Sequence, residues 1–283
     1  MDKSSILDTI KRALREDLDI EGDITSKVIL NNKNKIVFEF NSREEMVVCG
    51  IPILQELFAI YEDEIDYIIS QEEGVLIESN TTIIRGQSSI YTLFSIERVA
   101  LNFLQHLSGI ATITKSFIQK IQHTNVVIRD TRKTTPGLRA LEKYAVHVGG
   151  GNSYRYSLSD QILIKDNHIA ACNGDIAASI RQVKELWPER YIAVECDNLL
   201  QVEIAFECGV DLILLDNMLV LDIKRAVEIR SDSKTKLEAS GGITLQNVQE
   251  IAETGVDYIS IGMLTHSAPN KDIGLDIYHL KNT

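Results

Sequence analysis

Six short apolar runs rich in β-branched residues recur in the second half of the chain, and they constrain its fold more than any other feature. They are VVIRD from Val126, ILIKD from Ile162, YIAVE from Tyr191, LILLD from Leu212, KLEAS from Lys236 and YISIG from Tyr258. Most of the intervals between them carry a helical pattern, as in DIAASIRQVKEL and LQNVQEIAETG. Continuous apolar strands that alternate with helices indicate parallel βα units with both sheet faces covered. Six units are fewer than the eight of a closed barrel, so we predict an incomplete TIM-like α/β barrel.

The part of the chain before these runs has another pattern and predicts an α+β domain. About the first 25 residues are typical of an amphipathic helix, because apolar residues recur at helical spacing from Ile6 to Leu18. Strand-like runs follow, KIVFEF, MVVCG, GVLIES and SIYTLF, and a long helical pattern begins at Ile96. No GxGxxG follows the first strand, which argues against a dinucleotide-binding fold. We predict an N-terminal α+β domain over residues 1–110, the barrel over 111–269, and a tail, 270–283, that packs on the N-terminal domain.

Composition and charge exclude several classes of protein. The chain has 283 residues, 44% apolar and 25% charged, which is typical of a soluble globular protein. It has no apolar run of about 18 residues, and the start MDKSSILDTI has no signal-peptide core, so a cytoplasmic location is expected. The four cysteines are scattered without a CxxC, which predicts free thiols. The net charge of −12 argues against nucleic acid or an anionic membrane as a partner.

Ionisable residues recur at or just after the ends of the six predicted strands. Arg132 and Lys133 follow the first, Lys165 ends the second, Glu195 the third, Asp216 the fourth and Glu238 the fifth, and His266 follows the sixth. One such residue is usually a solvated loop residue. In TIM-like barrels, however, the carboxyl ends of the strands carry the active site. The repetition in all six units therefore predicts one common site.

The signs of these charges indicate the kind of ligand. Arg132, Lys133, Arg155 and Lys165 form a cationic cluster in an acidic protein, which predicts an anionic substrate. Glu195 and Asp216 are suited to sugar hydroxyls or to Mg²⁺, and ion pairs with the nearby lysines are the alternative. The SGGI segment from Ser240 runs into a helix, which is typical of a phosphate-binding loop. No GxSxG or Cys/His pairing offers a nucleophile, so chemistry by positioning and electrostatics is expected.

Several of these segments together resemble one family of enzymes. The segments are ERVALNFLQHLSGIAT, DTRKTTPGLRALEKYAV, LIKDNHI, LLDN, EASGGI and GMLTHSAP. They resemble quinolinate phosphoribosyltransferases, and the similarity spans nearly the whole chain. The resemblance implies that quinolinate and phosphoribosyl pyrophosphate, with Mg²⁺, give nicotinate mononucleotide, pyrophosphate and CO₂ in NAD biosynthesis. It also implies a homodimer whose active sites are shared between subunits.

The resemblance implies a role for each candidate site residue. Arg132, Lys133, Arg155 and Lys165 would hold the carboxylates of quinolinate, with Tyr154 beside them and Arg98 reaching in from the partner subunit. Glu195 and Asp216 would face the ribose hydroxyls and the metal, and Ser240, Gly241, Gly242, Gly262 and the nearby His266 would surround the 5′-phosphate. Lys133, Lys165, Glu195 and Asp216 are the expected catalytic residues.

Two positions depart from the family pattern. Tyr154 stands where the family usually has a histidine before the arginine, and Ala193 stands where it tends to have a further glutamate. Exchanging a charged hydrogen bond for a neutral one costs about 1 kcal/mol, a several-fold effect on binding. Three alternatives remain open. They are a phosphoribosyltransferase for another aromatic acid, a catalytically silent binding protein on the same fold, and a barrel lyase or aldolase in which Lys165 forms a Schiff base.

Overall fold

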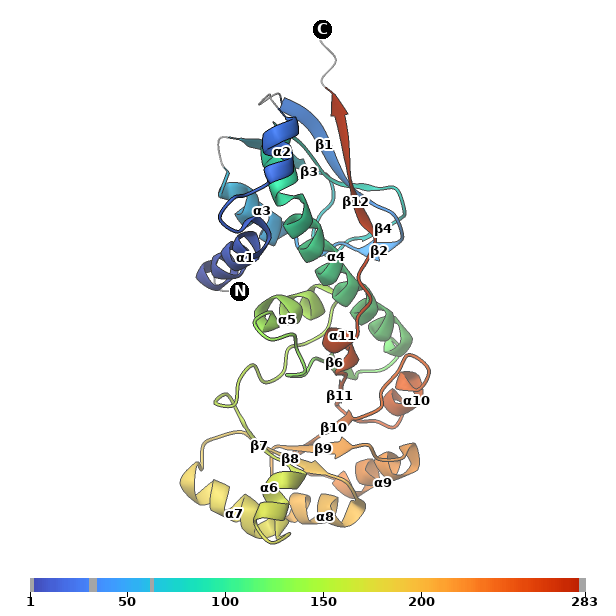
Figure 1. Ribbon diagram of the computed structural model, residues 1–283. Helices are drawn as coiled ribbons and strands as arrows, with labels where there is room; N and C mark the ends of the chain where they lie inside the picture. The colour runs from blue at the N-terminus through green and yellow to red at the C-terminus, as the bar shows by residue number, and fades with distance from the viewer. Residues whose placement is uncertain (1–2, 31–34, 62–63, 280–283) are drawn as a thin grey trace. The chain divides into compact units, whose positions relative to one another are not determined.

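The chain folds into two compact units, which are described separately. The computed structural model describes residues 3–30, 35–61 and 64–279. Unit 1 comprises Met1–Lys115, Thr134–Gly150 and Ser267–Thr283, and unit 2 comprises Ser116–Lys133 and Gly151–His266 (Figure 1). No helix among the described residues is both long enough and apolar enough to cross a membrane.

Unit 1 is an α+β domain built on a four-stranded antiparallel sheet. The sheet has the order β12-β1-β5-β3, with β12 at Ile273–His279, β1 at Lys35–Ser42, β5 at Thr82–Ser89 and β3 at Ile65–Ile69. The short strands β2 (Met46–Val47) and β4 (Leu76–Ile77) pair separately. Its helices are α1 (Lys3–Leu18), α2 (Ile24–Ile29), α3 (Ile51–Ala59), α5 (Arg139–Val148) and most of α4 (Ile90–Ile121), whose last residues, 116–121, belong to unit 2. The core includes a cluster of three buried rings, in which Phe38 meets Phe40 and Phe58 edge-to-face and the latter two are stacked.

One of the strands predicted in unit 1 is wrong. The run SIYTLF was expected to be a strand, but helix α4 begins at Ile90 and the strand β5 ends at Ser89. The hydroxyl of Ser89 accepts a hydrogen bond from the backbone N–H of Thr92 (3.0 Å) and so supplies a partner to the first turn of the helix. A β-branched and aromatic run therefore becomes helical because its first residues form a capped helix start.

The contacts divide the chain differently from the predicted domain boundaries at residues 110 and 269. The segment 134–150, which includes α5, belongs to unit 1 because α5 packs on α4. A Cβ on Gly149 would lie 2.5 Å from the carbonyl oxygen of Ala111, so the two helices approach too closely there for any side chain. The strand β12 of the tail pairs along the whole of β1, from Ile36 opposite His279 to Ser42 opposite Ile273.

Unit 2 is an α/β unit with a six-stranded parallel sheet. All six predicted runs form its strands, which are β6 (Val127–Arg129), β7 (Ile162–Ile164), β8 (Ile192–Cys196), β9 (Leu212–Asp216), β10 (Lys236–Ser240) and β11 (Tyr258–Ser260). The order is β6-β11-β10-β9-β8-β7, and among the described residues β6 and β7 do not pair with each other. The sheet therefore follows the order of a TIM-like barrel without closing, which confirms the predicted fold class.

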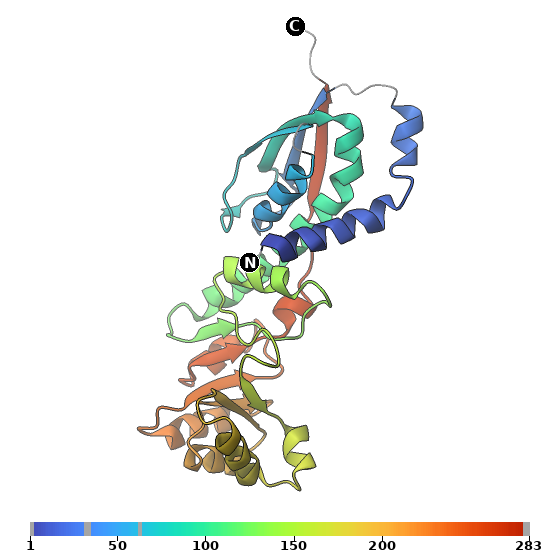
Figure 2. The same ribbon diagram turned by 90° about the vertical axis from the view of Figure 1, so that its left-hand side faces the viewer.

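Helices follow five of these strands within unit 2, as the alternating pattern predicts. They are α6 (Asp166–Ala171), α7 (Ile176–Leu186), α8 (Leu199–Glu207), α9 (Val220–Arg230), α10 (Val248–Ala252) and α11 (Met263–His266). Helix α11 follows the last of these strands without leading to another strand of this sheet. Figures 1 and 2 show α7, α8 and α9 along one face of the neighbouring strands. Polar N-caps start two of them, since Asp175 accepts from the N–H of Ala178 and Asn198 from that of Gln201.

A buried carboxylate ties three segments of unit 1 together. Glu142 on α5 has no exposed side-chain surface, and its Oε2 accepts a hydrogen bond from the N–H of Thr135 (3.1 Å). Its Oε1 lies 2.9 Å from Nε2 of His106 on α4, and Nδ1 of His106 lies 3.3 Å from Oδ1 of Asn270. The hydrogen bond to Glu142 raises the pKa of His106 above its ordinary value.

The stability of the fold is predicted to depend on pH through His106. Because its pKa is raised in the folded state, protonated His106 contributes stability that is fully present below about pH 6.5 and is lost as the pH rises through the folded-state pKa. In urea unfolding from about pH 5.5 to 9, His106→Gln should flatten this fall in the free energy of unfolding. The control His147→Gln, on the exposed side of α5, should keep the wild-type slope; an unchanged slope in His106→Gln would contradict the prediction.

Candidate active site

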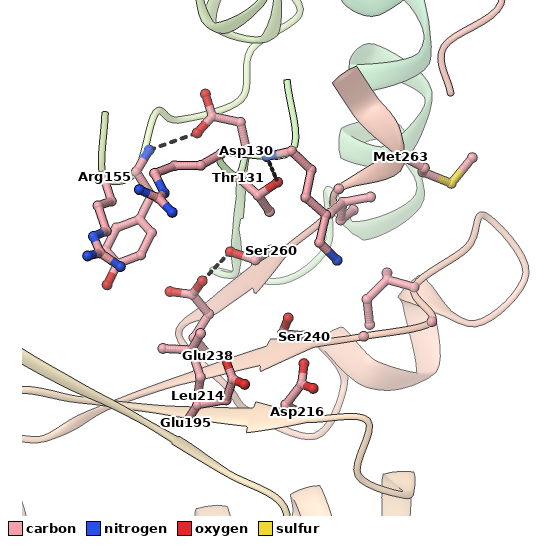
Figure 3. A pocket seen from close by; sticks show the side chains of 18 of the residues that line it. Asp130, Thr131, Arg155, Glu195, Leu214, Asp216, Glu238, Ser240, Ser260 and Met263 are labelled. Carbon is pink, nitrogen blue, oxygen red and sulfur yellow. Dashed lines mark hydrogen bonds between the residues drawn. The ribbon is translucent and has the colours of Figure 1, made fainter. Parts of the chain in front are cut away.

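A cavity of about 580 Å³ opens at the carboxyl ends of the strands of unit 2. Of the site residues that the sequence predicts, it brings together Arg132, Lys133, Tyr154, Arg155, Lys165, Glu195, Asp216, Ser240, Gly241, Gly242, Gly262 and His266. Figure 3 shows Arg155 on one side and Glu195, Asp216 and Ser240 on the other. Arg98 lies on α4 and is not among the lining residues.

Strand register explains why residues so distant in sequence meet here. In the parallel pairings, Asp216 at the end of β9 lies opposite Ser240 at the end of β10, and Ser240 lies opposite Ser260 at the end of β11. Glu195 on β8 is paired with Leu214 on β9. Because parallel strands begin and end together, polar residues at their carboxyl ends form one rim.

The cations of the cavity come from three segments. Arg132 and Lys133 follow β6, Lys165 follows β7, and Arg155 lies between these strands with a left-handed backbone at φ +40°. Left-handed φ is costly for a residue with a long side chain, so the surrounding structure holds Arg155 in place. Burial, and next the positive charge of Arg132, lowers the pKa of Arg155. Its Nε is buried without a hydrogen-bond partner among the described residues.

The two acids at the rim have different partners. Glu195, mostly buried, forms an ion pair with Lys165 at 2.5 Å between Oε2 and Nζ. This is the alternative that the sequence left open for Glu195. Asp216 instead accepts a hydrogen bond from the side-chain amide of Asn217 at 2.7 Å. Within the described ranges, no group of three or more His, Cys, Asp or Glu side chains is arranged to hold a metal ion.

The segment from Ser240 to Thr244 forms a glycine loop at the rim. Gly241 and Gly242 are both left-handed, with φ +87° and +60°. Asn247 braces the loop, since its Nδ2 donates to the carbonyl of Gly242 (3.0 Å) and its Oδ1 accepts from the N–H of Thr244 (2.8 Å). Consecutive backbone turns of this kind are typical of anion-binding concavities.

A second glycine shapes the same rim after β11. A Cβ on Gly262 would lie 3.0 Å from Cδ of Lys133 and 3.2 Å from Nε2 of His266, so glycine leaves just enough room for both side chains. The hydroxyl of Thr265 donates to the backbone carbonyl of Lys133 at 2.8 Å. The loop after β11 therefore fixes the segment that follows β6.

A charged network at the wall of the cavity was missed or misplaced by sequence reasoning. Glu238 lines the cavity as expected, but it was expected at a strand end, and this is wrong: it is the middle residue of β10 and is wholly buried. Nη1 of Arg129 donates to its Oε2 at 2.8 Å, and the hydroxyl of Ser260 donates to its Oε1. The guanidinium carbon of Arg129 lies 3.1 Å from the ring centre of Tyr258. The sequence feature that could have revealed this pair is the presence of opposite charges inside two apolar runs, Arg129 in VVIRD and Glu238 in KLEAS.

Tyr154 is held between this network and an apolar cluster. Its ring centre lies 4.7 Å from the guanidinium carbon of Arg129, and it packs in one buried cluster with Ala193, Leu212 and Leu214. Burial raises the pKa of Tyr154, so its hydroxyl is neutral. The two departures from the family pattern, Tyr154 and Ala193, therefore meet in one cluster.

Another buried acid, Asp130, fixes the segment that carries Tyr154. Asp130 follows β6 and has no exposed surface. Its Oδ1 accepts from the N–H of Tyr154 and its Oδ2 from the hydroxyl of Ser153, both at 3.0 Å. The sequence analysis gave Asp130 no role beyond being the first residue of DTRKTTPGLR. The feature that could have identified it is its position directly after a buried strand.

An α/β barrel with a cationic cavity and a glycine loop at its strand ends defines a class of protein that binds anionic, phosphorylated ligands. Comparison with known families is specific. The family described as quinolinate phosphoribosyl transferase, C-terminal domain, matches residues 110–276, and its N-terminal domain matches residues 23–108. The chain belongs to the quinolinate phosphoribosyltransferase family.

Individual relatives agree with this assignment. The chain is 41% identical over 277 residues to the nicotinate-nucleotide pyrophosphorylase (carboxylating) of Mycobacterium leprae, covering 95% of this chain and 96% of that protein. It is 38% identical to the probable enzyme of the same name from Bacillus subtilis, over 90% of this chain and 88% of the relative. The crystal structure of the nicotinate-nucleotide pyrophosphorylase from Ehrlichia chaffeensis superposes with a TM-score of 0.94 at 50% identity, covering 98% of this chain and 99% of that one.

The buried pair of Arg129 and Glu238 is predicted to be costly to break. Glu238→Gln leaves the guanidinium in the barrel interior without its counter-charge, so the free energy of unfolding should fall by about 3–5 kcal/mol. Urea unfolding measures this change. The double variant Arg129→Met/Glu238→Leu, which removes both charges, should lose less than Glu238→Gln alone.

The matched control is an acid of unit 1 in an exposed ion pair. Asp66 lies on β3 and bonds Lys35 at 3.0 Å with 77% of its side chain exposed. Asp66→Asn should change stability by less than about 1 kcal/mol. An equally small effect of Glu238→Gln would show that the buried pair does not stabilise the barrel.

Proposed function

We propose that this protein transfers the phosphoribosyl group of phosphoribosyl pyrophosphate to quinolinate with loss of CO₂. The products are nicotinate mononucleotide and pyrophosphate, and the step belongs to NAD biosynthesis. The observation that carries the proposal is the cavity at the strand ends of unit 2, where a cationic cluster, two acids and a glycine loop line one space. In a chain of this family, the cationic cluster corresponds to the carboxylates of quinolinate. The two acids correspond to the ribose hydroxyls, and the glycine loop corresponds to the 5′-phosphate.

The cationic cluster is proposed to bind the two carboxylates of quinolinate. Arg132 and Arg155 lie close enough for the charge of one to lower the pKa of the other. Such like-charge repulsion is relieved when a dianion enters between cations, so binding energy is available at this position. The partnerless Nε of Arg155 supplies a buried donor for the same ligand. Lys133 and Lys165 add point charges around it.

The glycine loop and the rim acids are proposed to bind the sugar phosphate. Ser240, Gly241, Gly242 and Gly262, with His266 beside them, would surround the 5′-phosphate. Asp216 would accept hydrogen bonds from the ribose hydroxyls, and Glu195 would do so together with its ion-pair partner Lys165. The strand register places Asp216 opposite Ser240, so a ligand that bridges hydroxyl and phosphate groups fits the spacing of the two strands.

The residues present are compatible with Mg²⁺ as a cofactor. Carboxylate oxygens from Glu195 and Asp216 line the cavity, and oxygen is the donor that Mg²⁺ prefers. Two acids are too few for a complete protein site, which suits an ion held partly by substrate oxygens. When bound there, the ion would offset charge on the departing pyrophosphate. We propose that Asp216 is its main protein contact, because Glu195 is already paired with Lys165.

The proposed reaction has two stages. The ring nitrogen of quinolinate forms a bond to the anomeric carbon while the bond to pyrophosphate breaks, and pyrophosphate leaves with the electron pair. The carboxylate next to the ring nitrogen then leaves as CO₂, its electron pair remains on the ring carbon beside the cationic nitrogen, and a proton adds there. Fixed cations orient the dianion for the first stage, so catalysis rests on positioning and electrostatics.

The proposed assembly is a homodimer in which each site uses Arg98 of the other subunit. Two observations support it. Arg98 does not line the cavity of its own chain. Unit 1 also exposes a group of large apolar side chains around α2, namely Ile20, Ile24, Val28 and Ile29, which is typical of a surface covered by a partner. We further propose a cytoplasmic protein with no nucleic-acid or membrane partner, in keeping with its net charge of −12.

The direct test is turnover by the purified protein. With Mg²⁺ and phosphoribosyl pyrophosphate, quinolinate should give stoichiometric nicotinate mononucleotide, pyrophosphate and CO₂, and nicotinate should give little product because it has one carboxylate fewer. Turnover of nicotinate or another aromatic acid but not of quinolinate would replace the substrate proposed here. No turnover of any acid, with binding retained, would favour a silent binding protein.

Variants at Tyr154 and Ala193, the two positions that depart from the family pattern, test the identity of the substrate further. Tyr154→His should change KM for quinolinate only several-fold, since one neutral hydrogen bond is exchanged for a charged one. Because Tyr154 and Ala193 share a cluster, the double variant Tyr154→His/Ala193→Glu should be more active on quinolinate than Tyr154→His alone. A gain of a hundredfold or more on quinolinate in either variant would mean that the wild-type pocket serves another acid.

Shared active sites predict complementation between two inactive variants. Arg98→Ala and Lys165→Ala should each lose most activity. After mixing and subunit exchange, half of the dimers are hybrid and one of their two sites is intact, so about a quarter of wild-type activity should return. Arg98→Ala mixed with Arg98→Ala/Lys165→Ala is the control and should stay inactive. Failure of the first mixture, despite demonstrated exchange, would place Arg98 in its own subunit's site or outside the mechanism.

A further inference from the structure

Asn217, the residue after β9, connects two parts of the cavity without lining it. It is the last residue of the segment LLDN and is not among the residues that form the cavity wall. Its side-chain Nδ2 donates to Oδ2 of Asp216 at 2.7 Å. Its backbone N–H donates to the carbonyl of Ser240 at 2.8 Å. One residue therefore contacts both the rim acid and the first residue of the glycine loop.

The glycine loop is also packed against Asn217. A Cβ on Gly241 would lie 2.2 Å from Oδ1 of Asn217 and 2.9 Å from its backbone nitrogen. A side chain at residue 241 has no space there, so the path of the loop depends on the carboxamide group. Gly241 has φ +87°, a second reason for glycine at this position.

The backbone of Asn217 is itself constrained. Its φ of +53° is in the left-handed region, which asparagine tolerates better than most residues because its short polar side chain bonds locally. The chain bends at Asn217, directly after β9 ends at Asp216. The residue type of Asn217, its left-handed backbone and its two hydrogen bonds therefore all favour the same position of this residue, in contact with Asp216 and Ser240.

We infer that Asn217 is a positioning residue that couples Asp216 to the phosphate-binding loop, so that ribose hydroxyls and 5′-phosphate are recognised as one unit. The inference rests on the proposed function, which places the sugar phosphate at Asp216 and the loop. It predicts selectivity for ligands that carry hydroxyl and phosphate at a fixed separation. Asn247 provides a matched comparison, because it braces the same loop through its hydrogen bonds to Gly242 and Thr244.

The test uses Asn217→Gly, which keeps the left-handed backbone accessible and removes the carboxamide. Loss of a hydrogen bond to a charged group should raise KM for phosphoribosyl pyrophosphate about tenfold. KM for quinolinate should stay within about twofold, because the cationic cluster is untouched. Asn217→Asp, which keeps the shape but places a second carboxylate beside Asp216, should raise KM for phosphoribosyl pyrophosphate further.

Double-mutant cycles separate coupling from simple bracing of the loop. In an Asp216→Ala background, Asn217→Gly should lose most of its effect, while Asn247→Ala should keep its own. Equal effects of Asn217→Gly on both substrates, or additivity with Asp216→Ala, would overturn the inference. Circular dichroism and cooperative unfolding establish that each variant is folded. If Asn217→Gly does not fold, Asn217→Asp decides by the same two criteria.

Binding of ribose 5-phosphate distinguishes this inference from the proposed function. Calorimetry with ribose 5-phosphate and with inorganic phosphate requires no turnover. Asn217→Gly should weaken ribose 5-phosphate about tenfold and inorganic phosphate much less. A wild type that binds ribose 5-phosphate but does not convert quinolinate would contradict the function and leave this comparison valid. Equal weakening of both ligands would contradict the coupling alone.

Discussion

The cavity depends on one constraint, the in-register parallel pairing of the strands of unit 2. Because β9, β10 and β11 end together, Asp216, Ser240 and Ser260 lie side by side without any further device. The buried pair of Arg129 and Glu238 connects β6 to β10 across β11 and holds that register from inside. A shift of one residue in any of these strands would turn the rim residue toward the opposite face and remove its polar side chain from the cavity.

Charge balance in the cavity follows from this arrangement. Arg132, Lys133 and Arg155 line the cavity together, and the positive charge of Arg132 contributes to the lowered pKa of Arg155, whereas Lys165 forms an ion pair with Glu195. The cavity therefore has a charge gradient, from a part lined by several cations to a part where a cation is paired with an acid, in a protein that is acidic overall. Such a gradient orients a ligand whose negative charges are unevenly placed, and it does so before any short contact forms.

The sequence predicts the barrel well because its strands are buried on both faces and so appear as continuous apolar runs. It predicts the rim residues because charges at strand ends are conspicuous after such runs. It misplaces Glu238, because the pattern of the sequence does not distinguish a buried acid from an exposed one. The burial of Glu238 becomes evident only when its partner Arg129 is seen in space. It also misreads SIYTLF, because one capping contact at Ser89 outweighs the strand propensity of the run. The meeting of Tyr154 with Ala193 joins residues 39 positions apart (193 − 154), which no local pattern reveals.

The edge strand β12 has a consequence for how the chain is made. It pairs with β1 across more than two hundred residues, since Ser42 lies opposite Ile273. During synthesis, β1 emerges before every strand of unit 2, and one of its edges stays open until β12 has left the ribosome. An open edge is where strands of other chains add, so the nascent protein carries an aggregation-prone surface throughout the making of the barrel. Residues made after the strands of unit 2 thus close a sheet that residues made before them began, so the sheet of unit 1 is complete only after unit 2 has been synthesised.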